Sequence, residues 1–148
     1  MKSLHDSHFD SVDVVLSRLS DVDYIASRQL ATAVYLAFNL EKPVLVEGPA
    51  GVGKTELAKA IAATTGARLI RLQCYEGLDE ARALYEWNYQ KQLLRIQSDH
   101  AEKRPWSEVA EHVFSREYLL ERPLLRAITA PRRVVLLIDE IHKADEEF

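Results

Sequence analysis

The sequence is poor in several features that would each point to a particular class of protein. It has one cysteine, Cys74, so an intramolecular disulfide is excluded and nothing indicates an oxidising compartment. Glycine and proline number five each among 148 residues, which excludes a collagen-like or low-complexity chain. The longest clean aliphatic run, Val134–Ile138, is far shorter than the roughly 20 residues that span a bilayer.

The charge balance is also modest. The 19 Lys and Arg residues against 23 Asp and Glu give a formal net charge of −4, whereas nucleic-acid-binding domains usually carry a basic face or stripe. The first ten residues are too polar for the apolar stretch of a signal peptide. With 47% apolar and 28% charged residues, the composition is that of a globular domain and excludes intrinsic disorder. We therefore expect a soluble, cytoplasmic protein with no membrane partner, for which nucleic acid is a disfavoured partner.

Hydrophobic periodicity predicts helices that alternate with short apolar strands. We expect Ser27 to cap the second helix at its start, Asn39 to close it in the left-handed conformation, and Gly66 to end the third. The expected helices cover residues 8–20, 28–39, 54–65, 79–97, 109–114 and 115–128, with a restart at Pro123, and the expected strands cover residues 43–47, 67–72 and 133–138. This alternation, with strands that are apolar throughout, predicts an α/β fold with a covered parallel sheet.

A phosphate-binding loop follows the first expected strand. The pattern G-x-x-x-x-G-K-[ST], a Walker A motif, is formed by Gly48, Pro49, Ala50, Gly51, Val52, Gly53, Lys54 and Thr55. Gly51 and Gly53 permit backbone angles and a close approach to phosphate that a side chain would prevent. Lys54 is placed to reach the β- and γ-phosphates, and the Thr55 hydroxyl to bind Mg²⁺. The loop therefore predicts nucleotide binding.

A second acidic site follows the last apolar strand. Val134–Ile138 is followed at once by Asp139 and Glu140, a Walker B element at the sheet edge where α/β folds bind ligands. We expect Asp139 to hold Mg²⁺ through water and Glu140 to polarise a water molecule for attack on the γ-phosphate. The alternative, a buried strand capped by two solvated acids, is disfavoured beside a complete phosphate loop. The pair therefore predicts hydrolysis.

These motifs resemble the AAA+ superfamily of ring-forming ATPases. The segments that look like its MoxR-type branch are Tyr24–Ala26, Leu45–Pro49, Gln73–Asp79 and Asp139–Phe148. Within that branch, Leu84–Tyr89 and Phe114–Leu125 are similar to a subgroup associated with carbon-monoxide-dehydrogenase maturation. The resemblance covers residues 22–148 as a partial AAA+ domain, and residues 1–21 are expected to be an N-terminal helical segment.

The resemblance implies a P-loop NTPase three-layer sandwich and a chaperone-like remodelling or maturation ATPase that uses ATP and Mg²⁺. It implies a homo-oligomeric ring such as a hexamer, a partner with a von Willebrand factor A domain, and a client metalloenzyme. It places Tyr24 and Ile25 in the adenine pocket, with packing between two helices as the alternative. For Tyr75 and Gly77 it suggests a pore loop, although a half-buried tyrosine beside a turn glycine is the favoured interpretation.

In AAA+ folds a fourth strand lies between the first and the third, and the third pairs with the second. Residues 43–47, 67–72 and 133–138 correspond to the first three strands, so the fourth and fifth strands, the helical lid and the arginine finger are expected beyond Phe148. We therefore expect an N-terminal part of a longer reading frame, with negligible turnover by these residues alone. Two alternatives stay open: a DNA-linked AAA+ motor or loader, and a truncated nucleotide-binding module without turnover.

Overall fold

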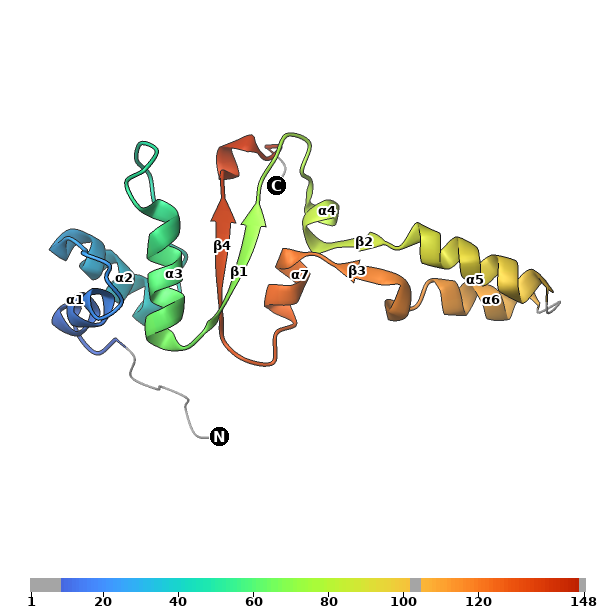
Figure 1. The fold of residues 1–148 in the computed structure, drawn as a ribbon, viewed down its shortest axis with the longest axis horizontal. Helices are drawn as coiled ribbons and strands as arrows, with labels where there is room; N and C mark the ends of the chain where they lie inside the picture. The colour runs from blue at the N-terminus through green and yellow to red at the C-terminus, as the bar shows by residue number, and fades with distance from the viewer. Residues whose placement is uncertain (1–8, 102–104, 147–148) are drawn as a thin grey trace. The chain divides into compact units, whose positions relative to one another are not determined.

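The computed structural model describes residues 9–101 and 105–146 (Figure 1). The expectations for the polar residues 1–8, and for Glu147 and Phe148 in the family resemblance, lie outside these residues. The chain divides into two compact units, residues 1–70 with 131–137 and residues 71–130 with 138–148. The boundary crosses strands β1 (Arg68–Gln73) and β4 (Val134–Asp139), so each unit holds part of both strands.

Strands β1 and β4 are neighbours in a two-stranded sheet, and their arrows run in the same direction in Figure 1. The expected strands 67–72 and 133–138 are therefore confirmed to within one residue, as is their pairing. Parallel strands need a long crossover between them. Here residues 74–133 form that crossover, and the mixed α/β structure with a parallel sheet fits a P-loop NTPase fold.

The first unit is built on three helices, α1 (Val12–Ser20), α2 (Arg28–Leu40) and α3 (Lys54–Thr65). Their apolar faces share one core because each helix buries a stripe of aliphatic side chains. The buried members of this core are Phe9, Val15, Leu19, Ala31, Val34, Leu57 and Ala60. The core fixes the helix that follows the phosphate loop against the two helices that precede it.

The helix ends follow local capping chemistry. The Ser27 hydroxyl accepts a hydrogen bond from the Leu30 backbone N–H at 3.2 Å, as predicted for an N-cap. Gly66 ends α3 with φ +62°, also as predicted. The prediction that Asn39 closes α2 is wrong: Glu41 takes the left-handed conformation, with φ +54°. The Asn39 side-chain amide donates instead to the Tyr35 carbonyl at 2.8 Å, which is compatible with helix continuing past it.

The strand expected at residues 43–47 is absent from the structure, and these residues lie in neither helix nor strand. Val46 packs against the core of the first unit, but Leu45 is 73% exposed. A strand exists only through hydrogen bonds with a neighbouring strand, and no described segment forms a ladder with residues 43–47. Apolar character alone was therefore an insufficient basis for this prediction.

The second unit corrects two predicted helices. The single helix expected over 79–97 is α4 (Glu80–Leu84), strand β2 (Tyr85–Trp87) and α5 (Tyr89–Ala101). The helix expected over 115–128 is a 3₁₀ turn η1 (Arg116–Tyr118), strand β3 (Leu119–Glu121) and α7 (Pro123–Ile128), which begins at the predicted Pro123. Both helices are interrupted because β2 and β3 pair in an antiparallel ladder, with Tyr85 opposite Glu121.

The remaining elements of this unit are α6 (Trp106–Val113), close to the helix expected at 109–114, and a 3₁₀ turn η2 (Ile141–Lys143) after β4. Aromatic side chains join the ladder to α6, because Trp87 packs edge-to-face on Phe114 with ring centroids 5.8 Å apart. None of the helices in the described part of the chain is long and apolar enough to cross a membrane.

Candidate functional site

The loop between residue 47 and α3 has the backbone that the glycine pattern predicts. Gly51 has φ +83° and Gly53 has φ +90°, values that side chains disfavour. Gly53 is also the N-cap of α3 and has no side chain with which to cap the helix. The first backbone N–H groups of α3 are therefore not covered by a capping side chain, and the positive end of the helix dipole lies at the same place. This arrangement suits an anion such as phosphate.

The Lys54 side chain is hydrogen-bonded to the backbone of this loop. Its ammonium Nζ donates to the carbonyl oxygens of Gly48 at 2.6 Å and Pro49 at 2.8 Å. These two bonds keep the positive charge at the loop, where the β- and γ-phosphates of a nucleotide would meet it. Thr55, the next residue, is half-buried in the first turn of α3. The structure therefore brings the charged and hydroxyl groups of the motif to the same helix end.

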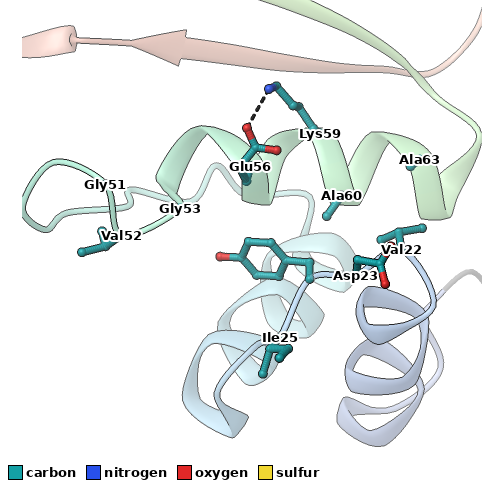
Figure 2. A pocket seen from close by; sticks show the side chains of 11 residues that line it. Val22, Asp23, Ile25, Gly51, Val52, Gly53, Glu56, Lys59, Ala60 and Ala63 are labelled. Carbon is teal, nitrogen blue, oxygen red and sulfur yellow. Dashed lines mark hydrogen bonds and ion pairs between the residues drawn. The ribbon is translucent and has the colours of Figure 1, made fainter.

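A cavity of about 440 Å³ lies beside the loop in the first unit. Figure 2 shows its lining, which comes from the turn after α1, from the loop and from α3; Glu56 and Lys59 of α3 form an ion pair of 2.6 Å at its edge. The residues that line it are Val22, Asp23, Tyr24, Ile25, Gly51, Val52, Gly53, Glu56, Lys59, Ala60 and Ala63. Its volume is within the range of small-molecule pockets, about 300–1,000 Å³.

Tyr24 and Ile25 line this cavity together with residues of the phosphate loop. Carbon Cε2 of the Tyr24 ring lies 3.7 Å from the position that a Cβ on Gly53 would take, and burial raises the pKa of the Tyr24 hydroxyl. Ile25 also lines the cavity but is 95% exposed. The alternative in which both side chains pack between two helices is therefore wrong for Ile25. Tyr24 lines the cavity and also packs against the core of the first unit.

The acidic pair lies in the second unit, where β4 ends. The Asp139 side chain is 17% exposed, and its Oδ2 accepts two hydrogen bonds from the Arg71 guanidinium, from Nη2 at 2.6 Å and Nε at 3.1 Å. Charge-assisted bonds of this length are among the stronger polar contacts in proteins. Asp139 is therefore held in a defined orientation by a residue of the neighbouring strand.

Glu140 has a different environment from Asp139. It adopts φ +56°, a left-handed conformation that is uncommon outside glycine and asparagine. Its carboxylate lies 3.2 Å from the Lys143 ammonium and 3.4 Å from the His142 imidazole. His142 lies in η2.

The described residues contain no group of three or more His, Cys, Asp or Glu side chains that could hold a metal ion. Mg²⁺ does not need such a cluster, because it is bound through one or two carboxylates together with substrate phosphates. Thr55 belongs to the first unit and Asp139 to the second. A hydroxyl and a carboxylate are the oxygen donors that Mg²⁺ prefers, so the donor chemistry of the predicted residues fits the ion.

The segment after β1 forms a tight turn. Gly77 has φ +82°, and its carbonyl accepts a hydrogen bond from the Arg82 guanidinium at 2.6 Å, which agrees with a turn glycine. Tyr75 is 47% exposed, more than the half-buried position expected for it. Cys74, by contrast, is 1% exposed, and burial, followed by the charge of Asp139, raises the pKa of its thiol.

Some contacts of the predicted site were not found from the sequence. Arg71 was predicted only as part of the strand at 67–72, and Gln73 only as part of the segment 73–79 in the family resemblance. In the structure Arg71 contacts Asp139 and also donates to the Gln73 side chain at 2.5 Å. Two polar residues spaced two apart in an otherwise apolar strand share one face of it. That spacing was the available signal. No comparable sequence pattern identifies the charged residues that line the cavity, Asp23, Glu56 and Lys59.

Comparison with known proteins gives one finding. Residues 44–147 match the family described as "ATPase family associated with various cellular activities (AAA)". The match runs from just before the phosphate loop to the segment after the acidic pair. No curated protein and no solved structure gives a significant match.

Proposed function

Because this chain belongs to the AAA family of ATPases, we propose that it binds ATP with Mg²⁺ at the phosphate loop and that the intact protein hydrolyses it. The observation that carries the proposal is the cavity of about 440 Å³ beside the loop, where Tyr24 and Ile25 meet Gly51 and Gly53. The cavity volume is within the range that accepts a nucleotide base, and the phosphates would extend to the start of α3.

Each predicted residue has a role in this proposal. Lys54 contacts the β- and γ-phosphates, and the backbone N–H groups of the loop bind the remaining phosphate oxygens. Thr55 and Asp139 would hold Mg²⁺, whose charge neutralises the phosphates and the leaving group. Glu140 is the base that orients and polarises the attacking water, after its carboxylate is released from Lys143 and His142.

We propose further that the protein is a MoxR-type remodelling or maturation ATPase. AAA domains commonly form oligomeric rings, and we propose a hexamer that works with a von Willebrand factor A partner on a client metalloenzyme in the cytoplasm. Support comes from the resemblance of Gln73–Asp79 and Asp139–Phe148 to that branch. In this proposal residues 22–148 are part of the AAA+ domain and residues 1–21 precede it.

A nucleotide-binding module without turnover is the second candidate function. The observation that favours it is that both acids are already ion-paired, Asp139 with Arg71 and Glu140 with Lys143. A carboxylate that contacts a cation must leave that contact before it can orient a water molecule. The two candidates agree on nucleotide binding and differ in hydrolysis.

The test measures binding and hydrolysis separately. Binding of a fluorescent ATP analogue should weaken at least tenfold in Lys54→Ala, because a charge-assisted contact to phosphate contributes about 1.5–3 kcal/mol. Lys42→Ala is the control, since Lys42 is an exposed lysine of the same unit outside the cavity. Equal affinity in both variants would refute the assignment of the site.

Hydrolysis then distinguishes the two candidates. In an active ATPase, Glu140→Gln should retain ATP binding and lose phosphate release, because glutamine cannot accept a proton from water. In a module without turnover, the substitution leaves the phosphate-release rate at background in both proteins. Binding to short DNA with a steep salt dependence would instead favour a DNA-linked motor.

A further inference from the structure

The contact between Arg71 and Asp139 is a feature of the second unit that the proposed function does not use. The two hydrogen bonds from the guanidinium to Asp139 end on the same carboxylate oxygen, Oδ2, at 2.6 Å and 3.1 Å. Asp139 is the residue to which the proposal assigns Mg²⁺. One oxygen of the proposed magnesium ligand is therefore already bound by a permanent cation, because arginine keeps its charge at every relevant pH.

The two residues are held in place by their surroundings. The Asp139 carbonyl accepts a hydrogen bond from the Cys74 backbone N–H at 2.9 Å, which fixes the main chain at the end of β4. The same Nη2 of Arg71 also donates a hydrogen bond to the Gln73 side-chain oxygen at 2.5 Å. The Asp139 side chain is only 17% exposed, so water competes weakly for the carboxylate. The contact is thus part of the folded sheet edge.

We propose that Arg71 is a positioning residue that competes with Mg²⁺ for the Asp139 carboxylate and so sets the Mg²⁺ concentration at which the nucleotide site assembles. This inference rests on the proposed function. A carboxylate that already accepts two charge-assisted hydrogen bonds is a poorer ligand for a second cation, and Mg²⁺ gives up its own water reluctantly. The positive charge of Arg71 also repels an ion bound at the other carboxylate oxygen.

The experiment titrates the whole chain with a fluorescent ATP analogue, first with all divalent ions chelated and then over a series of free Mg²⁺ concentrations. The variant is Arg71→Gln, which removes the charge and keeps a polar side chain. The matched control is Arg116→Gln, because Arg116 makes an Nη2 contact of the same 2.6 Å length to Glu121 in the same unit. Arg71→Lys tests whether charge alone suffices.

The expected result is a lower magnesium requirement in Arg71→Gln. The half-maximal Mg²⁺ concentration should fall by at least about tenfold, because full screening by water gives that effect for one unit charge close to a divalent ion and partial burial increases it. Affinity without Mg²⁺ should stay unchanged, and Arg116→Gln and Arg71→Lys should stay within about twofold of the original chain. An unchanged or higher requirement in Arg71→Gln would overturn the inference and leave nucleotide binding intact. If the affinity of the unsubstituted chain for the ATP analogue does not change with the Mg²⁺ concentration, the proposed function is overturned as well.

A second measurement needs no substitution. The exchange rate of the Arg71 Nε proton with water, followed by NMR, should be slow while Oδ2 accepts it and should rise when Mg²⁺ and the nucleotide are added together. Nucleotide with chelator should leave it slow. A rate that is the same under both conditions would contradict the proposed competition, even if the glutamine variant fails to fold.

Discussion

Replacing Gly51 with alanine separates the backbone strain of the phosphate loop from its role in binding. Gly51 has φ +83°, and a Cβ placed there meets no atom within 4 Å, so the substitution adds strain but no collision. Gly66 offers a matched control, because it has φ +62° and equally open space at the far end of α3. Both substitutions therefore introduce the same kind of backbone strain, one before the start of α3 and one at its end.

The penalty can be stated from general magnitudes. A left-handed conformation costs an ordinary residue about 1–2 kcal/mol relative to glycine, so each variant should lose that amount of unfolding free energy. For a chain of this size the midpoint of thermal unfolding should fall by about 2–8 °C in each case. Stability alone therefore does not distinguish Gly51→Ala from Gly66→Ala.

Binding should distinguish them. If alanine at position 51 relaxes toward negative φ, the loop N–H groups turn away from the phosphates, and the loss of one charge-assisted hydrogen bond weakens affinity about tenfold or more. Gly66→Ala should leave the affinity within about twofold, since Gly66 lies outside the cavity. Titration with a fluorescent ATP analogue measures both. Equal affinities in the two variants would refute the argument that the loop backbone binds phosphate.

Three other expectations concern stability. Leu19→Ala should cost about 2–5 kcal/mol in urea unfolding because Leu19 is 0% exposed, whereas Leu40→Ala, at a position 63% exposed, should cost under about 0.5 kcal/mol; similar losses would refute the assigned core. Ser27→Ala should cost about 1 kcal/mol through loss of the α2 cap, and an unchanged midpoint would contradict it. The hydrogen bond from Lys91 and its charge lower the pKa of the Glu117 carboxyl below its usual value of 4.5. The contact between Lys91 and Glu117 therefore contributes stability above pH 4.5, and this contribution is lost as the pH falls through the lower pKa of the folded protein. Lys91→Met should therefore flatten the acid side of a melting-temperature profile, and a parallel profile would show that the pair contributes nothing.

Local rules predicted the features that depend on neighbouring residues. The Ser27 cap, the closure of α3 at Gly66 and the start of α7 at Pro123 each follow from the chemistry of one residue and its helix. The positive φ values at Gly51 and Gly53 belong to the same class, since the motif requires them. In these places the sequence pattern and the structure agree because no distant contact is involved.

Pairing over long sequence distances was predicted less well. Residues 43–47 are apolar but form no ladder with any described segment, so their composition did not determine a strand. Tyr85–Trp87 reads as the middle of a helix, yet it pairs with Leu119–Glu121, more than thirty positions along the chain. A short segment with mixed propensity takes the structure that its partner imposes. The partner could not be identified from either segment alone.

The acidic pair shows the same division between local pattern and distant contact. The apolar strand followed by Asp139 and Glu140 correctly locates two carboxylates at the end of β4, and those side chains have the oxygen donors for Mg²⁺ and water. It does not reveal that Arg71, 68 positions earlier, binds Asp139, or that Glu140 takes a left-handed conformation next to Lys143. A motif of two acids therefore specifies which groups can act, whereas the cations that face them specify what Mg²⁺ and the catalytic water must displace. If Arg71 competes as proposed, this second property resides in a strand residue that a Walker B pattern never includes.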